Sequence, residues 1–481
     1  MLKRPFLTGE DYKSAFNLFC CIYGIGTLGM PGNFARAGPK IAVIAMAFMA
    51  FANIYSSITM SKVMLLAPKS VKTFGDLGEW SIGMTGRWLC TISQMGSCLL
   101  IPCVFLVLGG QLLDGLFPNA FSQTTWTILM ALMVLPVCLV PTLKEGSGAA
   151  FAGCMGTIVA DVIGVTVVIY GMRGHPSVPF PDLKFSQVAS VFGNLSLAYG
   201  AGIVIPDLQR QHSDPTRMPR VVGLTVGFVS ILFLILSSTA YSAVGCQISG
   251  NLLFTIYPDK ETGMTAWICS KLGHSFYIAE RLFLGMHKST TDGIEIEDGF
   301  EENTTHVNVH GKQSDAGFSN TNNDTLFQRN RRSKLSYVSV ADSERVHKDN
   351  EEEEAAEYTG SNVFKYVALR VFIVAILVVL AIVFKDHFSE FADFVGASCI
   401  TTNCILLPII FYLIKTWDRV PMYEKIAAIM VVVVCFVLGC YVTYTTGKAL
   451  FLPKENDVEF PFCNAEYENT IYYNYTAVHE A

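Results

Sequence analysis

The chain has 481 residues, of which 51% are hydrophobic and 15% are charged, and its formal net charge at pH 7 is −6. Soluble proteins have about a quarter of their residues charged, so this composition excludes a chain built mainly of water-soluble domains. A mildly acidic chain also lacks the basic surface that a nucleic-acid-binding protein needs.

Apolar residues occur in long stretches, ten of which can cross a membrane, since a spanning helix needs about 20 apolar residues. In chain order they are residues 14–33, 40–66, 88–113, 124–142, 149–171, 186–206, 221–244, 363–384, 391–414 and 423–446. Within lipid only helices and closed barrels satisfy the backbone, and these stretches are too long and too evenly apolar for barrel strands. We therefore predict an all-α polytopic, integral membrane protein.

The sequence divides into segments of different composition. We expect a cytoplasmic N-terminus (1–13), helices 1–7 (14–249), a weaker region (250–286), an acidic cytoplasmic loop (287–362), helices 9–11 (363–446) and a C-terminal tail (447–481). The acidic loop holds sixteen acidic and eight basic side chains and no long apolar run, so we expect it to be disordered. A solvated linker is favoured over a regulatory segment with phosphorylation sites, and both stay open.

The number of crossings is ambiguous. Basic residues gather on the cytoplasmic side of membrane proteins. If the N-terminus is cytoplasmic, the loops between the first seven spans follow this rule. Arg36 is then placed in an outward loop. If 250–286 supplies a crossing, then Lys415, Arg419 and Lys425 also lie inside. Without that crossing they lie outside. The charge rule therefore predicts eleven crossings, whereas hydropathy supplies ten.

Most of the fourteen cysteines lie in predicted helices, where they serve as small packing residues. Cys246 and Cys463 are exceptions that could both be extracytoplasmic and could form a disulfide. The sequence contains no CxxC motif and no His/Cys cluster with metal-ligand spacing, so we predict neither a metal site nor a cofactor. The tail contains one glycosylation sequon, Asn474-Tyr475-Thr476, which is usable only if the tail is extracytoplasmic.

The first span is rich in glycine. Gly24-Ile25-Gly26-Thr27-Leu28-Gly29-Met30-Pro31-Gly32 places four glycines and a proline in nine residues. Both residue types weaken a helix, and a break at membrane depth is tolerated only where the freed backbone lines a cavity or is buried in protein. Such half-helix ends bind substrates in many transporters. We predict a broken helix, with close packing by small residues as the alternative.

Two motifs resemble those of a known family. One is Asn17-Leu18 followed by Gly24-x-Gly26-x-Leu28-x-x-Pro31, and the other is Gly75-Asp76-Leu77-Gly78-Glu79 ahead of Gly83, Gly86 and Arg87. They are similar to the first helix and the following cytoplasmic link of the amino acid/auxin permease family, in the APC superfamily. The resemblance covers 14–246 and 363–447. It implies eleven helices in a 5+5 inverted repeat with broken first and sixth helices, and amino-acid transport coupled to protons or sodium.

By position, the resemblance implies that the backbone of Gly24, Ile25, Gly26, Thr27, Leu28 and Gly29 holds the substrate's α-carboxylate and amine, with Thr27 as a possible side-chain ligand. The sixth span would be the repeat partner of the first, and it too is interrupted, by Gly193-Asn194 and Tyr199-Gly200-Ala201-Gly202 ahead of Pro206. We name Tyr199 as the candidate side chain facing the substrate, and Gly200 beside it as a further substrate-binding candidate. An ordinary packing role for this aromatic ring is equally open.

The coupling ion is predicted to be a proton rather than sodium. Sodium-coupled members of the family tend to carry a polar residue where this chain has Cys20, and a thiol is a poor ligand for a hard cation. Asp161, near the middle of the fifth span, is the candidate coupling residue; a structural carboxyl hydrogen-bonded to a neighbouring helix is the alternative. Arg370 and Asp393 lie near the ends of predicted spans, where we expect them to snorkel or cap.

The eighth helix departs from the family pattern. Phe276-Tyr277-Ile278-Ala279-Glu280-Arg281 is similar to its cytoplasmic end, but the apolar run that should precede it is absent. We predict a secondary active transporter that moves amino acids by alternating access. A transporter-like sensor that signals through 287–362, or a transport-incompetent splice variant, are the alternatives.

We predict no enzyme activity, because the sequence lacks a nucleophile elbow, a phosphate loop and paired metal ligands. The expected partners are a small amino acid and the lipid bilayer, not nucleic acid. The plasma membrane and a vacuolar or lysosomal membrane are both open as locations.

Overall fold

The computed structural model describes residues 6–68, 70–71, 73–117, 120–139, 147–171, 180–200, 202–248, 252, 362–452 and 462–463. Every described residue belongs to one compact unit, which comprises parts of 1–260 and 343–481. The predictions for the weaker region and for the acidic loop, including its signalling role, lie outside the described residues, apart from Leu252 and Asn362.

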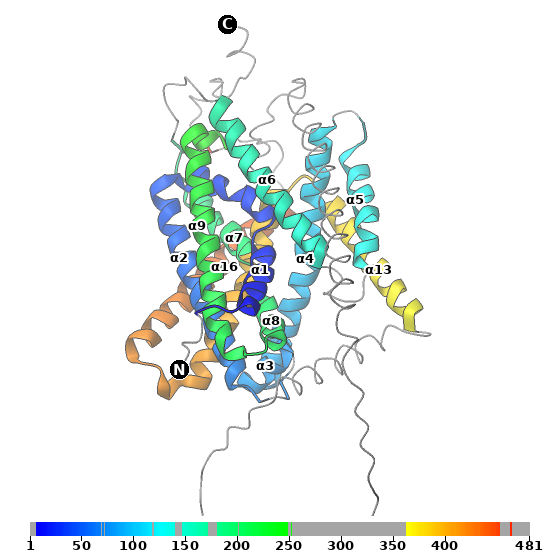
Figure 1. Cartoon of the computed structure of the whole chain (residues 1–481). Coiled ribbons are helices and arrows are strands. Elements are labelled where there is room, and N and C mark those ends of the chain that lie inside the picture. Colours follow the sequence, from blue (N-terminus) through cyan, green and yellow to red (C-terminus); the bar gives the residue numbers. More distant parts are fainter. Residues whose placement is uncertain are drawn as a thin grey trace, which may run out of the picture. The chain divides into compact units, whose positions relative to one another are not determined.

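The described part is helical (Figure 1), and its one extended pairing is an isolated antiparallel bridge between Pro181 and Cys463. The first helices are α1 (Gly9–Ile22), η1 (Ile25–Gly29), α2 (Met30–Leu66), α3 (Phe74–Ile82), α4 (Met84–Leu116), α5 (Gln123–Cys138) and α6 (Ser147–Gly171). They are followed by α7 (Phe185–Ala198), η2 (Gly202–Val204), α8 (Ile205–Gln211), η3 (Pro215–Arg217), α9 (Met218–Val244) and η4 (Gly245–Gln247). The last are α13 (Asn362–Val383), α14 (Phe388–Val395), the π-helical η5 (Gly396–Leu406), α15 (Leu407–Thr416), η6 (Trp417–Arg419) and α16 (Met422–Phe451).

Eight helical stretches of the described part are long and apolar enough to span a membrane, and α5 is a shorter apolar helix. The prediction of an all-α polytopic membrane protein is confirmed. One of the eight, Gly26–Leu66, covers parts of two predicted spans, because the chain bends at Gly38. Gly38 has φ 71°, a left-handed backbone that favours glycine, and Pro39 follows it without an N–H. Eight stretches therefore do not equal eight crossings.

The first predicted span is broken where its glycines lie. Helix α1 ends at Ile22, the backbone of Gly24 is extended at φ −140° and ψ −158°, and the tight 3₁₀ turn η1 leads into α2. The sixth span is broken in the same manner: α7 ends at Ala198, a turn at Tyr199 and Gly200 follows, and η2 leads into α8. Both breaks agree with the prediction.

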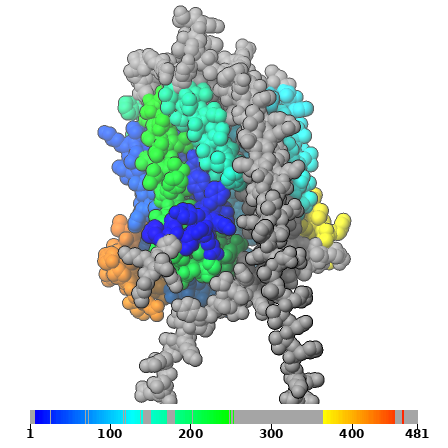
Figure 2. Space-filling model, in the orientation of Figure 1, coloured from blue at the N-terminus to red at the C-terminus, as the bar shows by residue number. Residues whose placement is uncertain are grey.

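Apolar side chains cover the outside of the bundle. Helices α1, α6 and α9 lie side by side on the face in Figure 2 and contact one another. On α9 the side chains of Leu224, Phe228, Ile231 and Ile235 are exposed at helical spacing. A row of this kind on a span suits contact with lipid tails rather than water.

Two charged residues lie in the interior, where the sequence did not place them. Arg36 is in α2 rather than in an outward loop, and Asp393 is in α14; each is 3% exposed. Arg36 Nη1 lies 2.6 Å from Asp393 Oδ2 and also donates to Ser190 Oγ on α7 at 3.1 Å. The expectation that Asp393 snorkels or caps is wrong, because its charge is neutralised by a partner 357 residues away in sequence.

Close backbone approach brings α7 against α14 and η5. A Cβ atom on Gly193 would lie 2.5 Å from the Asp393 carbonyl oxygen, and one on Gly396 would lie 2.0 Å from the Gly193 carbonyl oxygen. Only glycine fits at these two positions. This contact sets Asn194 beside α14.

The cysteines behave largely as predicted. Cys246 and Cys463 form a disulfide with their Cα atoms 5.3 Å apart, which realises the pairing considered from the sequence. Eleven other cysteines of the described part are free, and all of them lie in helices.

Candidate functional site

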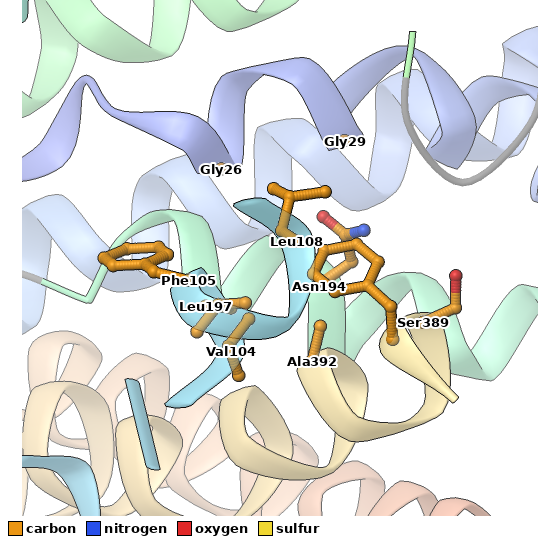
Figure 3. A pocket seen from close by; sticks show the side chains of 10 residues that line it. Gly26, Gly29, Val104, Phe105, Leu108, Asn194, Leu197, Ser389 and Ala392 are labelled. Atoms are coloured by element: carbon orange, nitrogen blue, oxygen red, sulfur yellow. The ribbon is translucent and has the colours of Figure 1, made fainter. Parts of the chain in front are cut away.

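A cavity lies against the break in the first span, between η1, α4, α7 and α14 (Figure 3). It is lined by ten described residues: Gly26, Gly29, Val104, Phe105, Leu108, Asn194, Leu197, Phe388, Ser389 and Ala392. About 30 Å³ of it is open to the centre of a water molecule, and one water needs about 10–15 Å³ on that measure. The cavity holds about two waters, so a larger molecule requires its walls to move apart.

The lining is neutral, with one polar end. Figure 3 shows Val104, Phe105 and Leu197 toward one end of the cavity and Asn194 and Ser389 toward the other. None of the ten lining residues is charged. The arrangement suits a molecule with an uncharged apolar part, whose polar groups meet backbone, amide and hydroxyl groups.

The predicted substrate residues divide into two groups. Gly26 and Gly29 line the cavity, and Figure 3 shows both on the η1 ribbon above it. The other six, Gly24, Ile25, Thr27, Leu28, Tyr199 and Gly200, are not among the lining residues. Thr27 and Leu28 are buried on other sides of η1, at 0% and 4% exposed. A break also leaves carbonyls at the end of α1 and amides at the start of η1 without helical partners, which are the groups a zwitterion can use.

Asp161 is connected to the break in the first span. It is 2% exposed, and its Oδ1 accepts a hydrogen bond from Thr27 Oγ1 at 3.1 Å. The Tyr23 side chain interacts with the same carboxyl group. Asp161 Oδ2 is buried without a hydrogen-bond partner among the described residues. The carboxyl group therefore contacts both sides of the break, through Tyr23 before it and Thr27 after it.

Tyr199 packs away from the cavity. Its hydroxyl group donates to Ser230 Oγ on α9 at 2.8 Å, and its ring meets Phe233 edge-on at 5.3 Å. Phe233 also stacks on Tyr23 at 6.1 Å, so one ring on α9 contacts the breaks of both spans. These contacts fit the packing alternative for Tyr199, and its role toward a substrate stays a prediction.

A second polar cluster joins the start of α1 to the connection after α8. Asp11 is 1% exposed, and its carboxyl group accepts from Arg217 Nη2 at 2.6 Å and lies 3.0 Å from His212 Nε2. The hydrogen bond from Arg217 holds the pKa of Asp11 well below its usual range. Asp11 also completes a capping box with Thr8. The cluster fastens the beginning of the first span to the end of the sixth.

The family model described as transmembrane amino acid transporter protein matches residues 9–451. The chain belongs to this family.

Relatives in the transmembrane amino acid transporter family are moderately similar in sequence. Amino acid transporter AVT1D of Arabidopsis thaliana is 25% identical over 278 residues, which cover 54% of this chain and 48% of the relative. Amino acid transporter AVT3A of the same plant is 26% identical over 50% of this chain and 59% of its own length. Vacuolar amino acid transporter 7 of Saccharomyces cerevisiae is 22% identical over 52% of this chain and 53% of its own length. The chain spans about half the length of the curated relatives it matches.

Family membership confirms the resemblance drawn from the two glycine motifs, and the chain is a multi-pass membrane protein of a transport family rather than an enzyme family. Sequence reasoning missed Asn194 and Ser389 as lining residues. Asn194 stands in the predicted interruption of the sixth span, yet nothing in the spacing indicates that it meets η1. Ser389 has no signal at all, because α14 reaches the cavity only through its contacts with α7 and α4.

Proposed function

We propose that this chain moves amino acids across a membrane by alternating access, with protons as the coupling ion. The observation that carries the proposal is that Gly26 and Gly29, at the break of the first span, form one wall of a neutral cavity. The backbone from Gly24 to Gly29 would hold the substrate's α-carboxylate and amine, and the apolar end of the cavity would receive its side chain. The names of the relatives support amino acids as the substrate class.

Two ties at opposite ends of the first span support alternating access. Asp11 pairs with Arg217 at the beginning of α1, and Arg36 pairs with Asp393 near the Gly38 bend. The cavity at the break of the first span lies between these two ties in the sequence of the span. Release of one tie at a time would open the cavity to one side of the membrane while the other side stays shut.

Asp161 supports proton coupling. A carboxyl group in a span is costly as a charge, and the Oδ2 atom of this one has no hydrogen-bond partner among the described residues, so it can take up a proton. In our proposal, protonation changes the hydrogen bond that Thr27 donates and so changes the geometry of η1 beside the cavity. Substrate and proton then act on the same turn of the chain, which is what coupling requires.

The test uses the purified full chain in proteoliposomes. We expect saturable uptake of radiolabelled neutral amino acids that rises with an imposed pH gradient, stops when a protonophore dissipates it, and is unchanged when potassium replaces sodium. Uptake that does not depend on the pH gradient would exclude proton coupling. An absence of saturable uptake for every amino acid tested would exclude the transport function.

Variants at the coupling site sharpen this test. Asp161→Asn removes the titrating group, so the residual uptake or exchange should lose its dependence on the pH gradient. Thr27→Val is the matched change, because it removes only the donated hydrogen bond and keeps the carboxyl group. It should shift the pH at which uptake is half-maximal. An unchanged pH profile in both variants would show that Asp161 is a structural carboxyl.

A further inference from the structure

The segment Phe462–Cys463 is fastened to three other parts of the chain. Cys463 is disulfide-bonded to Cys246, just after α9. The Asp182 N–H donates to the Phe462 carbonyl oxygen at 2.9 Å, ahead of α7. The Arg36 guanidinium lies 5.5 Å from the centre of the Phe462 ring. These contacts fix the beginning of the C-terminal tail at the same end of the helices as Cys246.

The last three spans can be oriented from their contacts. At one end, the Phe384 ring after α13 lies 4.7 Å from Phe391 in α14 and 6.0 Å from Phe451 at the end of α16. At the other end, the Tyr412 hydroxyl in α15 donates to Glu424 at the start of α16 at 3.3 Å. The chain therefore passes through the bundle three times after Asn362: in α13, in α14–η5–α15 and in α16.

These passes fix the side of Asn362. Cys463 and Cys246 lie on one face of the membrane, because the disulfide joins them. Three passes separate Asn362 from Cys463, so Asn362 lies on the opposite face from both cysteines. The chain therefore crosses the membrane between Cys246 and Asn362. The distribution of basic residues predicts this additional crossing, whereas the count of ten spans from hydropathy does not include it.

Charge and redox chemistry identify the two faces. The face opposite the disulfide holds Arg217, Lys415 and Lys425, together with Lys13, Lys62, Arg87, Arg210, Arg220 and Arg419. Basic residues gather on the cytoplasmic face, and disulfides persist in oxidising compartments outside the cytosol. Both criteria assign the Cys246–Cys463 face to the extracytoplasmic side.

We propose that the C-terminal tail faces an oxidising, extracytoplasmic compartment and carries an N-linked glycan on Asn474. Asn474 stands eleven residues after Cys463 in the sequence, and Asn474-Tyr475-Thr476 is an acceptor sequon. The acidic loop contains two further sequons, Asn303-Thr304-Thr305 and Asn323-Asp324-Thr325. Because Asn362, which follows the loop, lies on the cytoplasmic face, the proposal predicts that Asn303 and Asn323 stay unmodified.

The modification is a group transfer from a lipid-linked oligosaccharide diphosphate. A bond forms between the Asn474 amide nitrogen and C1 of the oligosaccharide, while the bond between C1 and the diphosphate oxygen breaks. The amide nitrogen loses one proton, and the lipid diphosphate leaves with the bonding electron pair. The donor and the transferase are present where membrane proteins of eukaryotic cells are made, on the extracytoplasmic side of the membrane.

The experiment compares variants of the full chain expressed in a eukaryotic cell, with and without an endoglycosidase that removes N-linked glycans. We expect the unmodified sequence to migrate faster after the enzyme, and Asn474→Gln to migrate at the faster position without it. Thr476→Ala should behave like Asn474→Gln, whereas Thr476→Ser keeps a sequon and should keep the shift. The Asn303→Gln/Asn323→Gln double variant should shift like the unmodified chain.

The outcomes separate cleanly. A shift that survives Asn474→Gln but is lost in the double variant would reverse the assignment of the two faces and overturn the proposal. An unmodified chain that shows no shift would overturn Asn474 as a modification site. Mass spectrometry of unreduced peptides should recover the Cys246–Cys463 pair, and its absence from membranes that carry the folded chain would remove the basis of the orientation.

Discussion

The first and sixth spans are both interrupted at glycines, and the surroundings of the two interruptions differ. In the first span, Gly26 and Gly29 face a cavity, and Thr27 donates to the carboxyl group of Asp161. In the sixth span, Tyr199 packs on α9, and a Cβ atom on Gly202 would lie 3.0 Å from Cys404 in η5. One break borders open space, and the other is closed by neighbouring helices.

This contrast shows what a glycine-rich interruption does and does not imply. Glycine in a span either frees the backbone for a ligand or permits close packing, and this chain uses it in both ways. The helices packed against each break determine which of the two roles its glycines have. Helices α4 and α14 leave a gap beside η1, whereas α9 and η5 fill the space beside the break in the sixth span. The two breaks remain coupled, because the Phe233 ring contacts both Tyr23 and Tyr199.

The largest effect on binding and transport is expected at Gly26. Gly26→Leu adds a branched side chain beside the cavity, of which about 30 Å³ is open to the centre of a water molecule. The Cβ atom of this side chain would already lie 3.4 Å from Ala198 Cα. We expect substrate binding and uptake to fall to background, a loss of at least about tenfold, which is about 1.4 kcal/mol. Equilibrium binding of labelled amino acid to the purified protein measures this directly.

Two matched changes test whether the site or the fold is affected. Gly26→Ala adds only a methyl group at ordinary contact distance and should keep most of the binding. Gly200→Ala places the same methyl group 3.0 Å from the Leu197 carbonyl oxygen in the sixth break, so it should lower the thermal midpoint but leave the KM for substrate unchanged. Normal uptake in Gly26→Leu would remove the first break from the site.

The buried ion pair should give the largest loss of stability. Arg36 fastens the first span to both α7 and α14, through Ser190 and Asp393. Arg36→Ala leaves the Asp393 carboxyl group buried without its cation, which costs about 3–5 kcal/mol of unfolding free energy. Chemical unfolding in detergent measures it.

A double variant serves as the control for that measurement. Arg36→Met with Asp393→Leu removes both charges and keeps apolar bulk, so it should recover most of the lost stability. If the single and the double variant are equally unstable, the loss does not come from the unpaired charge of Asp393.

The sequence predicted local features and missed long-range ones. Apolar length identified the spans, and the spacing of glycines identified both breaks, because each feature depends on neighbouring residues alone. The pair Arg36–Asp393 joins residues that are 357 positions apart, and the lining role of Ser389 depends on how α14 docks against α7 and α4. Asp393 and Ser389 carry no local signal of these contacts. The sequence pattern therefore placed Asp393 near a helix end and did not single out Ser389.

A smaller, pH-dependent effect is expected at Asp11, which ties the beginning of the first span to the end of the sixth. Its pKa in the folded state is held low by Arg217, below the unfolded value of about 3.9. A carboxyl group of this kind stabilises the fold above its unfolded pKa, and the contribution is lost as the pH falls through the folded pKa. The tie should therefore persist at pH 5 and weaken only in stronger acid.

Asp11→Asn provides the comparison. Its thermal midpoint should be lower at pH 7 than that of the unmodified chain. The difference should shrink below about pH 4, because the carboxyl group takes up a proton in the unfolded state there while the folded state keeps it charged. Arg217→Gln should lower the midpoint at pH 7 by a similar amount, and the two changes combined should cost little more than either alone. Fully additive losses would show that the two side chains act independently.

The smallest effect is expected at Tyr199, and it tests the contrast between the two breaks from the other side. Tyr199→Phe removes the hydrogen bond to Ser230 and keeps the ring against Phe233, so it should cost about 1 kcal/mol of unfolding free energy. Because Tyr199 does not line the cavity, the KM for amino acids should be unchanged. A KM raised severalfold with unaltered stability would mean that the cavity extends to the sixth break when the protein opens. The substrate would then lie between the two breaks rather than against the first alone.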